Sequence, residues 1–198
     1  MVTSLESRWP LGDDLTDVRD ELVAAYATGR GYHDTRHLAE VLDRLEELGE
    51  AGEEFDHEAV TLAAWFHDAV YDGRAEAEER SAQWALQALA GRPVASEVAR
   101  LVRLTESHLP ADDDANGCVL SDADLAILAA TPERYAEYTA DVRREYAHVP
   151  EDLFRAGRAA VLRDLLAKRS LFHTAHAREH WEARARANVE AELTVLGG

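Results

Sequence analysis

Three segments that contain histidine or aspartate, well separated along the chain, have the residue types that bind divalent metal ions. His67 and Asp68 stand side by side within the largely apolar run 63–72. Burying an imidazole beside a carboxylate is costly unless both are paired, because desolvation penalises charged groups and unpaired polar groups alike. A divalent cation would pair with both at once. We therefore interpret this run as part of a metal site.

Two further segments offer additional ligands for such an ion. His33 and His37 are four positions apart, just over one helical turn, so both can share one face of a helix. Asp122 and Asp124 follow a polar loop, where a helix is predicted to open. Nitrogen and carboxylate ligands without thiolate suit Mn, Fe, Co, Ni, Zn or Mg and leave positions for water and substrate. The sequence thus predicts a divalent metal ion as cofactor, with its identity open.

The elements that must position these residues are predicted to be helices. Proline and glycine are sparse in the 198 residues, and no segment shows sustained alternation of apolar and polar residues. We find no repeat and no shift in composition that would mark a second domain. The predicted fold is a single all-α domain over residues 1–198, a bundle of about eight or nine helices. These cover about 14–28, 34–48, 56–71, 77–90 and 95–108, begin near 121, 132 and 151, and end with 175–193.

Composition excludes several classes of partner and site. The net charge of −18 argues against a DNA or RNA polymer and against an anionic membrane surface. The single cysteine, Cys118, excludes an internal disulfide and a cysteine-based zinc cluster. No apolar run approaches the roughly 20 residues of a membrane span, and the N-terminus lacks a secretory pattern. We expect a cytoplasmic protein, with its oligomeric state open.

The order of the candidate ligands resembles a known family. The HD superfamily of metal-dependent phosphohydrolases carries a histidine, a His-Asp pair and an aspartate on successive helices. The matching residues here are His37, His67, Asp68 and Asp124. One branch also shows a Tyr-His-x-x-x-His start, a Trp-Phe-His-Asp-x-x-Tyr-Asp centre, a Glu-x-x-Ser-Ala segment and an Asp-x-Asp-Leu segment, which match at 32–37, 65–72, 78–82 and 122–125. The resemblance spans most of the chain and implies an HD-domain fold with these four residues as metal ligands.

The resemblance also implies a reaction, the hydrolysis of a phosphoester in a nucleotide or other small phosphorylated metabolite. The metal ion would activate water, and one carboxylate among Asp68, Glu78 and Glu79 would orient or deprotonate it. Ala77 stands where members of the branch often carry asparagine, which leaves the roles of the two glutamates open. The candidates for contact with substrate are His33, Arg36, Tyr71 and His108.

Several alternatives stay open at the level of sequence. Asp122 is interpreted as a helix cap or as a partner of the ligands, whereas the resemblance prefers Asp124 as the ligand. His33 and His108 raise the alternative of a di-iron oxygenase, since some HD relatives use extra histidines. A third alternative is a regulatory module that binds metal and nucleotide without turnover.

Overall fold

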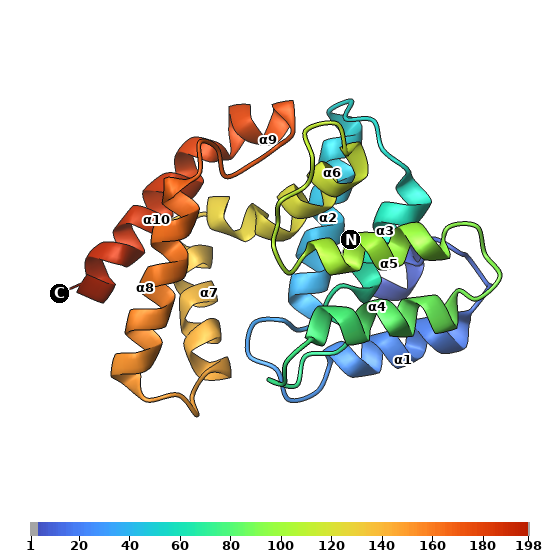
Figure 1. Ribbon diagram of the computed structural model, residues 1–198, viewed down its shortest axis with the longest axis horizontal. Coiled ribbons are helices and arrows are strands. Elements are labelled where there is room, and N and C mark those ends of the chain that lie inside the picture. The colour runs from blue at the N-terminus through green and yellow to red at the C-terminus, as the bar shows by residue number, and fades with distance from the viewer. Residues whose placement is uncertain (1–3, 198) are drawn as a thin grey trace.

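The computed structural model describes residues 4–197, and this part of the chain forms helices and no strands (Figure 1). The prediction of an all-α fold is confirmed. Two short 3₁₀ helices, η1 (Leu5–Arg8) and η2 (Ala126–Ala129), accompany ten α-helices. The α-helices are α1 (Thr16–Tyr26), α2 (Thr35–Glu50), α3 (His57–Phe66), α4 (Ala77–Ala88), α5 (Ala95–Leu104), α6 (Ala115–Leu125), α7 (Pro132–Glu145), α8 (Glu151–Ala167), α9 (Ala175–His180) and α10 (Glu182–Gly197).

Helix α3 lies at the centre of the bundle, in contact with α2, α4, α5 and α6. Seven of its ten residues are buried, as its apolar sequence predicts. Helix α2 instead buries one stripe, in which His37, Leu38, Val41, Leu42, Leu45 and Leu48 recur at three- and four-residue intervals. The outer side of α2 stays polar. The stripe on α2 therefore carries His37 into the interior against α3.

Several predicted helix boundaries are wrong, among them the end of α5, which lies at Leu104 rather than at 108. Helix α3 ends at Phe66 rather than Tyr71, so His67 and Asp68 lie in the turn beyond it. Helix α6 begins at Ala115, capped by the carboxylate of Asp114, which accepts from the Gly117 amide. Glycine fits that position because a Cβ atom would lie 2.3 Å from the Asp114 carboxylate.

The earlier start of α6 also moves Ser121 away from the helix end. A helix that begins near 121 would have Ser121 at its start, but this residue lies buried inside α6. The last predicted helix, 175–193, is two helices that meet at Trp181. That break gives ten α-helices among the described residues, where nine ranges were predicted.

Helices α7, α8 and α10 form a second group beside the α1–α5 group, and α6 with η2 lies between them (Figure 1). Helix α10 packs on both α8 and η2. The amide of Asn188 on α10 donates to the carbonyls of Leu128 and Ala130, at 2.8 and 2.9 Å. Two carbonyls left free by the short η2 turn are thereby satisfied. The C-terminal helix thus holds the chain just after the predicted ligand Asp124.

None of the helices within residues 4–197 combines the length and the apolar character that crossing a membrane requires.

Candidate metal centre

His37, His67 and Asp124 converge although they come from different parts of the chain. Each offers one ligand atom, and these three atoms lie within 4.8 Å of one another. The two Nε2 atoms of the histidines are 3.0 Å apart, and Asp124 Oδ1 lies 3.2 Å from the first and 3.7 Å from the second. Both imidazoles are about 2% exposed. The structure therefore brings together the ligands that the sequence placed on three separate segments.

Asp68 completes the cluster from the turn after α3. Its Oδ2 atom lies 3.1 Å from Nε2 of His67 and 3.4 Å from Nε2 of His37. This oxygen is buried and has no hydrogen-bond partner among the described residues. A buried carboxylate oxygen without a hydrogen bond is costly, and a cation is the partner that best removes this cost.

The spacing of these four atoms fits a common ion. Ligand atoms at about 2.1 Å from one metal are roughly 3.0 Å apart in adjacent octahedral positions and about 3.4 Å apart in tetrahedral ones. Separations of 3.0, 3.1, 3.2 and 3.4 Å lie in that range, and the one between His67 Nε2 and Asp124 Oδ1, at 3.7 Å, lies slightly beyond it. Two imidazole nitrogens that face each other at 3.0 Å also need a shared proton or cation between them. The residues present thus fit a divalent metal ion.

The electrostatics of the cluster favour positive charge at its centre. Burial disfavours the charged form of His37, but the hydrogen bond to Asp124 and the charges of Asp124 and Asp68 outweigh burial and raise its pKa to about 10. The pKa of His67 is raised in the same way by these two carboxylates. Burial would raise the pKa of each aspartate, yet the neighbouring histidines lower both. Negative charge therefore persists on the two carboxylates and calls for a cation.

The His67 ring is held in one orientation by its second nitrogen. Nδ1 lies 2.7 Å from the carbonyl of Ala64, and a carbonyl can only accept, so Nδ1 carries the proton. When the ring is neutral, as it is in a metal complex, it therefore presents the lone pair of Nε2 to the cluster. This is the usual arrangement of a metal-binding histidine, whose outer nitrogen is fixed by the backbone.

Arg30 holds the turn that carries His67 and Asp68. Its Nη1 donates to the carbonyls of Asp68 and His33, at 2.6 and 2.9 Å, and its Nη2 donates to the carbonyl of Ala69 at 3.0 Å. The amide of Asp68 donates to the hydroxyl of buried Tyr26 at 3.1 Å. Carbonyls past the end of α3 would otherwise be unsatisfied. Arg30 is a positioning residue that sequence reasoning missed.

The two aspartates of α6 point to different partners. Residues two apart on a helix diverge by about 200°, so Asp122 faces away from the cluster while Asp124 faces it. The carboxylate of Asp122 accepts from the amides of His173 and Thr174, at 2.7 to 3.0 Å. Burial raises the pKa of Asp122 to about 6, although those hydrogen bonds oppose the rise. Asp122 thus holds the segment that leads into α9; it does not cap its own helix, because it lies inside α6 and Asp114 is the N-cap.

His108 joins the edge of the cluster. Its Nε2 lies 3.5 Å from Asp124 Oδ2, the oxygen on the opposite side of that carboxylate from the one nearest the two histidines. Its Nδ1 is 3.2 Å from the Ser121 hydroxyl, which explains the buried serine inside α6. The backbone of His108 is left-handed, with φ of +50°. This rare conformation turns the imidazole back toward Asp124 at the end of the α5 segment.

His33 lies near the cluster but is bound by a different group. Its Nδ1 is 2.6 Å from the carboxylate of Glu145, and its ring stacks on Tyr71 with centroids 4.1 Å apart. Glu145 also accepts from the amides of Gly31, Tyr32 and His33 itself, at 2.9 to 3.2 Å. The rings of His33 and His37 are 5.6 Å apart. His33 thus borders the cluster without sharing its ligand atoms.

The structure does not bring the other predicted site residues to the cluster. Arg36 is half exposed and pairs with Glu40 and Glu137. Glu79 forms an ion pair with Arg103 and accepts from a glutamine on its own helix. Glu78 lies half buried in the first turn of α4.

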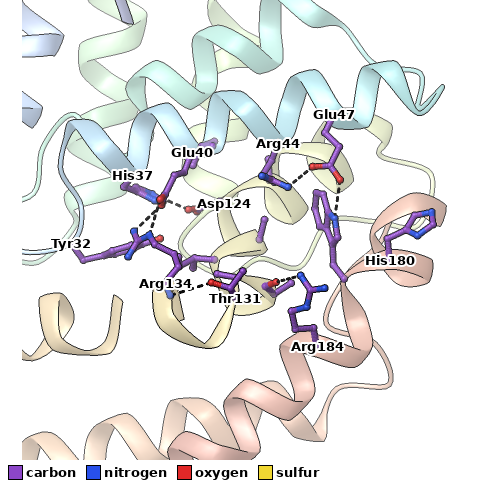
Figure 2. Close-up of a pocket in the computed structure, with 17 residues that line it drawn as sticks. Tyr32, His37, Glu40, Arg44, Glu47, Asp124, Thr131, Arg134, His180 and Arg184 are labelled. Carbon is purple, nitrogen blue, oxygen red and sulfur yellow. Dashed lines mark hydrogen bonds and ion pairs between the residues drawn. The ribbon is translucent and has the colours of Figure 1, made fainter. Parts of the chain in front are cut away.

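A cavity of about 560 Å³ opens beside His37 and Asp124 (Figure 2). Its size is typical of small-molecule sites, which span roughly 300–1,000 Å³. One wall is the polar face of α2, and the facing wall comes from α6, η2, α7 and the α9–α10 junction. The lining residues are Tyr32, His37, Glu40, Val41, Arg44, Glu47, Ala123, Asp124, Ala126, Ile127, Ala129, Ala130, Thr131, Arg134, His180, Trp181 and Arg184.

The cavity residues Arg134 and Arg184, like Glu145, were missed by sequence reasoning. Arg134 occupies a polar helix face, where arginine is most often exposed, yet its side chain is only 14% exposed. Its guanidinium pairs with Glu40 at 2.7 Å, 94 residues away in the chain. Nothing in local spacing signals such a contact. The Tyr-His-x-x-x-His segment at 32–37 was the one signal for Glu145, because the carboxylate of Glu145 accepts from amides at the start of that segment.

Comparisons of this chain with protein-family models, with curated proteins and with solved structures find no significant match, so the chemistry of the site itself is the basis for a functional assignment.

Proposed function

We propose that the chain is a metal-dependent phosphohydrolase of the HD type that cleaves a small phosphorylated metabolite, with nucleotides as the first class to test. The observation that supports it most is the buried set of His37, His67, Asp68 and Asp124 beside an open cavity. A structural ion would be enclosed by protein, whereas this cluster faces a space that a substrate can enter. The resemblance in sequence order points to the same reaction.

The roles of the residues follow from their positions. When bound, a divalent cation polarises a phosphoryl oxygen and lowers the pKa of water, which favours hydrolysis. Asp68 is the carboxylate best placed to orient or accept a proton from the attacking water, because its Oδ2 lacks a protein donor. Arg134, fixed by Glu40, lies at the same end of the cavity and would bind the phosphoryl group. Water adds across the P–O bond, releasing phosphate and an alcohol.

The test is release of phosphate from a panel of nucleotides and other phosphoesters, with Mn, Co, Ni, Mg or Fe supplied. We expect turnover that chelation abolishes and that falls at least a thousandfold in the His67→Ala, Asp68→Ala double variant. The matched control is His148→Ala with Asp152→Ala, which removes the same residue types from an exposed surface. Absence of turnover in the metal-loaded protein, or equal turnover in the site variant, would contradict the proposal. Tight nucleotide binding without turnover would instead support a regulatory module.

One observation favours a second ion. Asp124 directs one oxygen to His37 and the other to His108, so this carboxylate has the geometry to bridge two positions. If both positions held iron, the di-iron oxygenase alternative would be favoured over the phosphohydrolase. Elemental analysis after aerobic and anaerobic expression distinguishes the cases, because one non-iron metal per chain is incompatible with a di-iron site.

A further inference from the structure

The cavity beside the metal centre has arginine side chains at both ends, although the chain carries a net charge of −18. Arg134 lies at the end that contains His37 and Asp124, and Arg44 and Arg184 lie toward the other end (Figure 2). Cationic groups gathered on one cavity of an acidic protein indicate that anionic groups bind there. Two separate cationic ends indicate two such groups on one ligand.

Arg184 is the least compensated of these arginines. Its one hydrogen bond in the described chain is a long one, from Nη1 to the carbonyl of Ala129 at 3.5 Å. No carboxylate of residues 4–197 lies within ion-pair distance of its guanidinium. The guanidinium of Arg184 therefore has N–H groups that can donate to a ligand at the cavity surface.

Arg44 adds a second positive group whose partner is shared. It forms an ion pair with Glu47, but Glu47 Oε1 also lies 3.0 Å from His176 Nε2 and accepts from Trp181 Nε1 at 3.1 Å. Arg44 also lies over the Trp181 ring, 5.8 Å from its centre. One carboxylate thus serves several donors, and the end formed by Arg44 and Arg184 carries excess positive charge.

The wall that faces α2 has an apolar part between the two ends. It consists of alanine and isoleucine side chains from α6, from η2 and from the residue after η2: Ala123, Ala126, Ile127, Ala129 and Ala130. Such a wall suits the organic part of a ligand rather than a chain of phosphates. The cavity therefore combines a metal end, an apolar middle and a cationic end.

We propose that the cavity takes a phosphoester that carries a second anionic group, with the ester at the metal centre and the second group at Arg44 and Arg184. This proposal rests on the proposed function, since it names the substrate class of that same site. The two candidate kinds of substrate share one feature: a short organic group separates the phosphoester from a second anionic group. A sugar phosphate of a nucleotide or the carboxylate of a phosphorylated acid would supply it.

The experiment compares paired probes that differ in the second anion, by calorimetric binding to the chain with and without Mn²⁺. AMP is paired with adenosine bisphosphate, and glycerol phosphate is paired with phosphoglycerate. We expect the member with two anionic groups to bind about tenfold tighter in at least one pair, and that pair identifies the source of the second anion. The preference should shrink as salt rises, because the cationic end is solvent-exposed.

Arg184→Gln should remove most of that preference and leave the binding of the singly anionic members within about twofold. The matched control is Arg178→Gln, because Arg178 lies on neighbouring α9, donates to the Phe172 carbonyl and does not line the cavity. Equal affinity within both pairs, no binding of any probe, or equal weakening of all probes by Arg184→Gln would overturn the inference. A preference without turnover would sink the proposed function alone, and turnover without a preference would sink this inference alone.

Discussion

Residues at the candidate metal centre have two kinds of role. Some would bind the ion, and others hold the surrounding backbone in place. The clearest case is the pair on α6, where Asp124 faces His37 and Asp122 binds the amides of His173 and Thr174. The same residue type, two positions apart, serves two purposes because about half a helical turn separates the two faces. Substitution of Asp124 should therefore affect metal affinity, and substitution of Asp122 should affect stability.

Asp124→Asn should weaken Mn²⁺ binding at least a hundredfold with little loss of stability in the metal-free protein. Asp122→Asn should keep the metal affinity but lower the free energy of unfolding by about 1–3 kcal/mol, because two buried amides lose a charged acceptor. Calorimetry with Mn²⁺ and urea unfolding measure the two effects. Loss of metal binding in Asp122→Asn with retention in Asp124→Asn would reverse the assignment.

Among the elements, α7 holds the loop before α2 through the carboxylate of Glu145. Burial alone would raise the pKa of Glu145, but hydrogen bonds from His33 and from the loop amides, with the charge of His33, outweigh burial and lower the pKa to about 2. Gly31 is required at this junction, because a Cβ atom there would lie 2.5 Å from the carbonyl of Asp141. The loop and the end of α7 are thus tightly joined.

Because the pKa of Glu145 is lower in the folded chain than its ordinary value of 4.5, its charged form stabilises the fold above about pH 5. This contribution, on the order of 3 kcal/mol, disappears as pH falls through about 2. Glu145→Gln should therefore be clearly less stable than wild type at pH 7, and the difference should shrink between pH 5 and pH 3. Urea unfolding across this range measures it. Glu133→Gln, on an exposed site of the same helix, is the control, and a difference independent of pH would contradict the prediction.

The sequence predicts an element well when the interactions that form it lie within that element, and poorly when they come from distant residues. The stripe on α2 was predictable because it repeats within one helix, and the proline after Thr131 marked the start of α7. The end of α3 was not, because the apolar run continues to Val70 while the chain leaves the helix at Phe66. That departure is fixed by Arg30 and Tyr26, which contact the turn from another helix and loop.

The candidate site was likewise predictable only where its features are local in the sequence. Residue types and order were sufficient to nominate the four ligands, whose proximity the structure then shows. The walls of the cavity were not predictable, because Arg134 and Arg184 are brought to it by the packing of α7 and α10. Sequence spacing within a helix carries no information on which distant helix covers a given face.

For the whole molecule, a cation at the centre would join segments that are otherwise held by packing and a few hydrogen bonds. The four ligands come from α2, from the turn after α3 and from α6, and a chain that unfolds separates them. Binding energy at such a site is also folding energy, since the unfolded chain lacks the cluster.

Mn²⁺ at a hundred times its dissociation constant should therefore stabilise the fold by about 2.7 kcal/mol, which raises Tm by roughly 5–10 °C for a chain of this size. Thermal unfolding with added Mn²⁺ and after chelation measures the shift. The shift should vanish in the His67→Ala, Asp68→Ala double variant and persist in the His148→Ala, Asp152→Ala control. A rise of equal size in both variants would mean that the ion binds elsewhere.

The clamp of Asn188 on the carbonyls of Leu128 and Ala130 has a consequence for how such a protein diversifies. The four candidate ligands lie at or before residue 124, whereas much of the wall facing α2 is built and braced by residues after 125. Under the proposed function, changes confined to the later stretch, Arg134 aside, would leave the candidate ligands in place and alter which molecule fits the cavity. The candidate metal ligands and most of the cavity wall that faces them thus come from successive parts of the chain, so each part can change without the other.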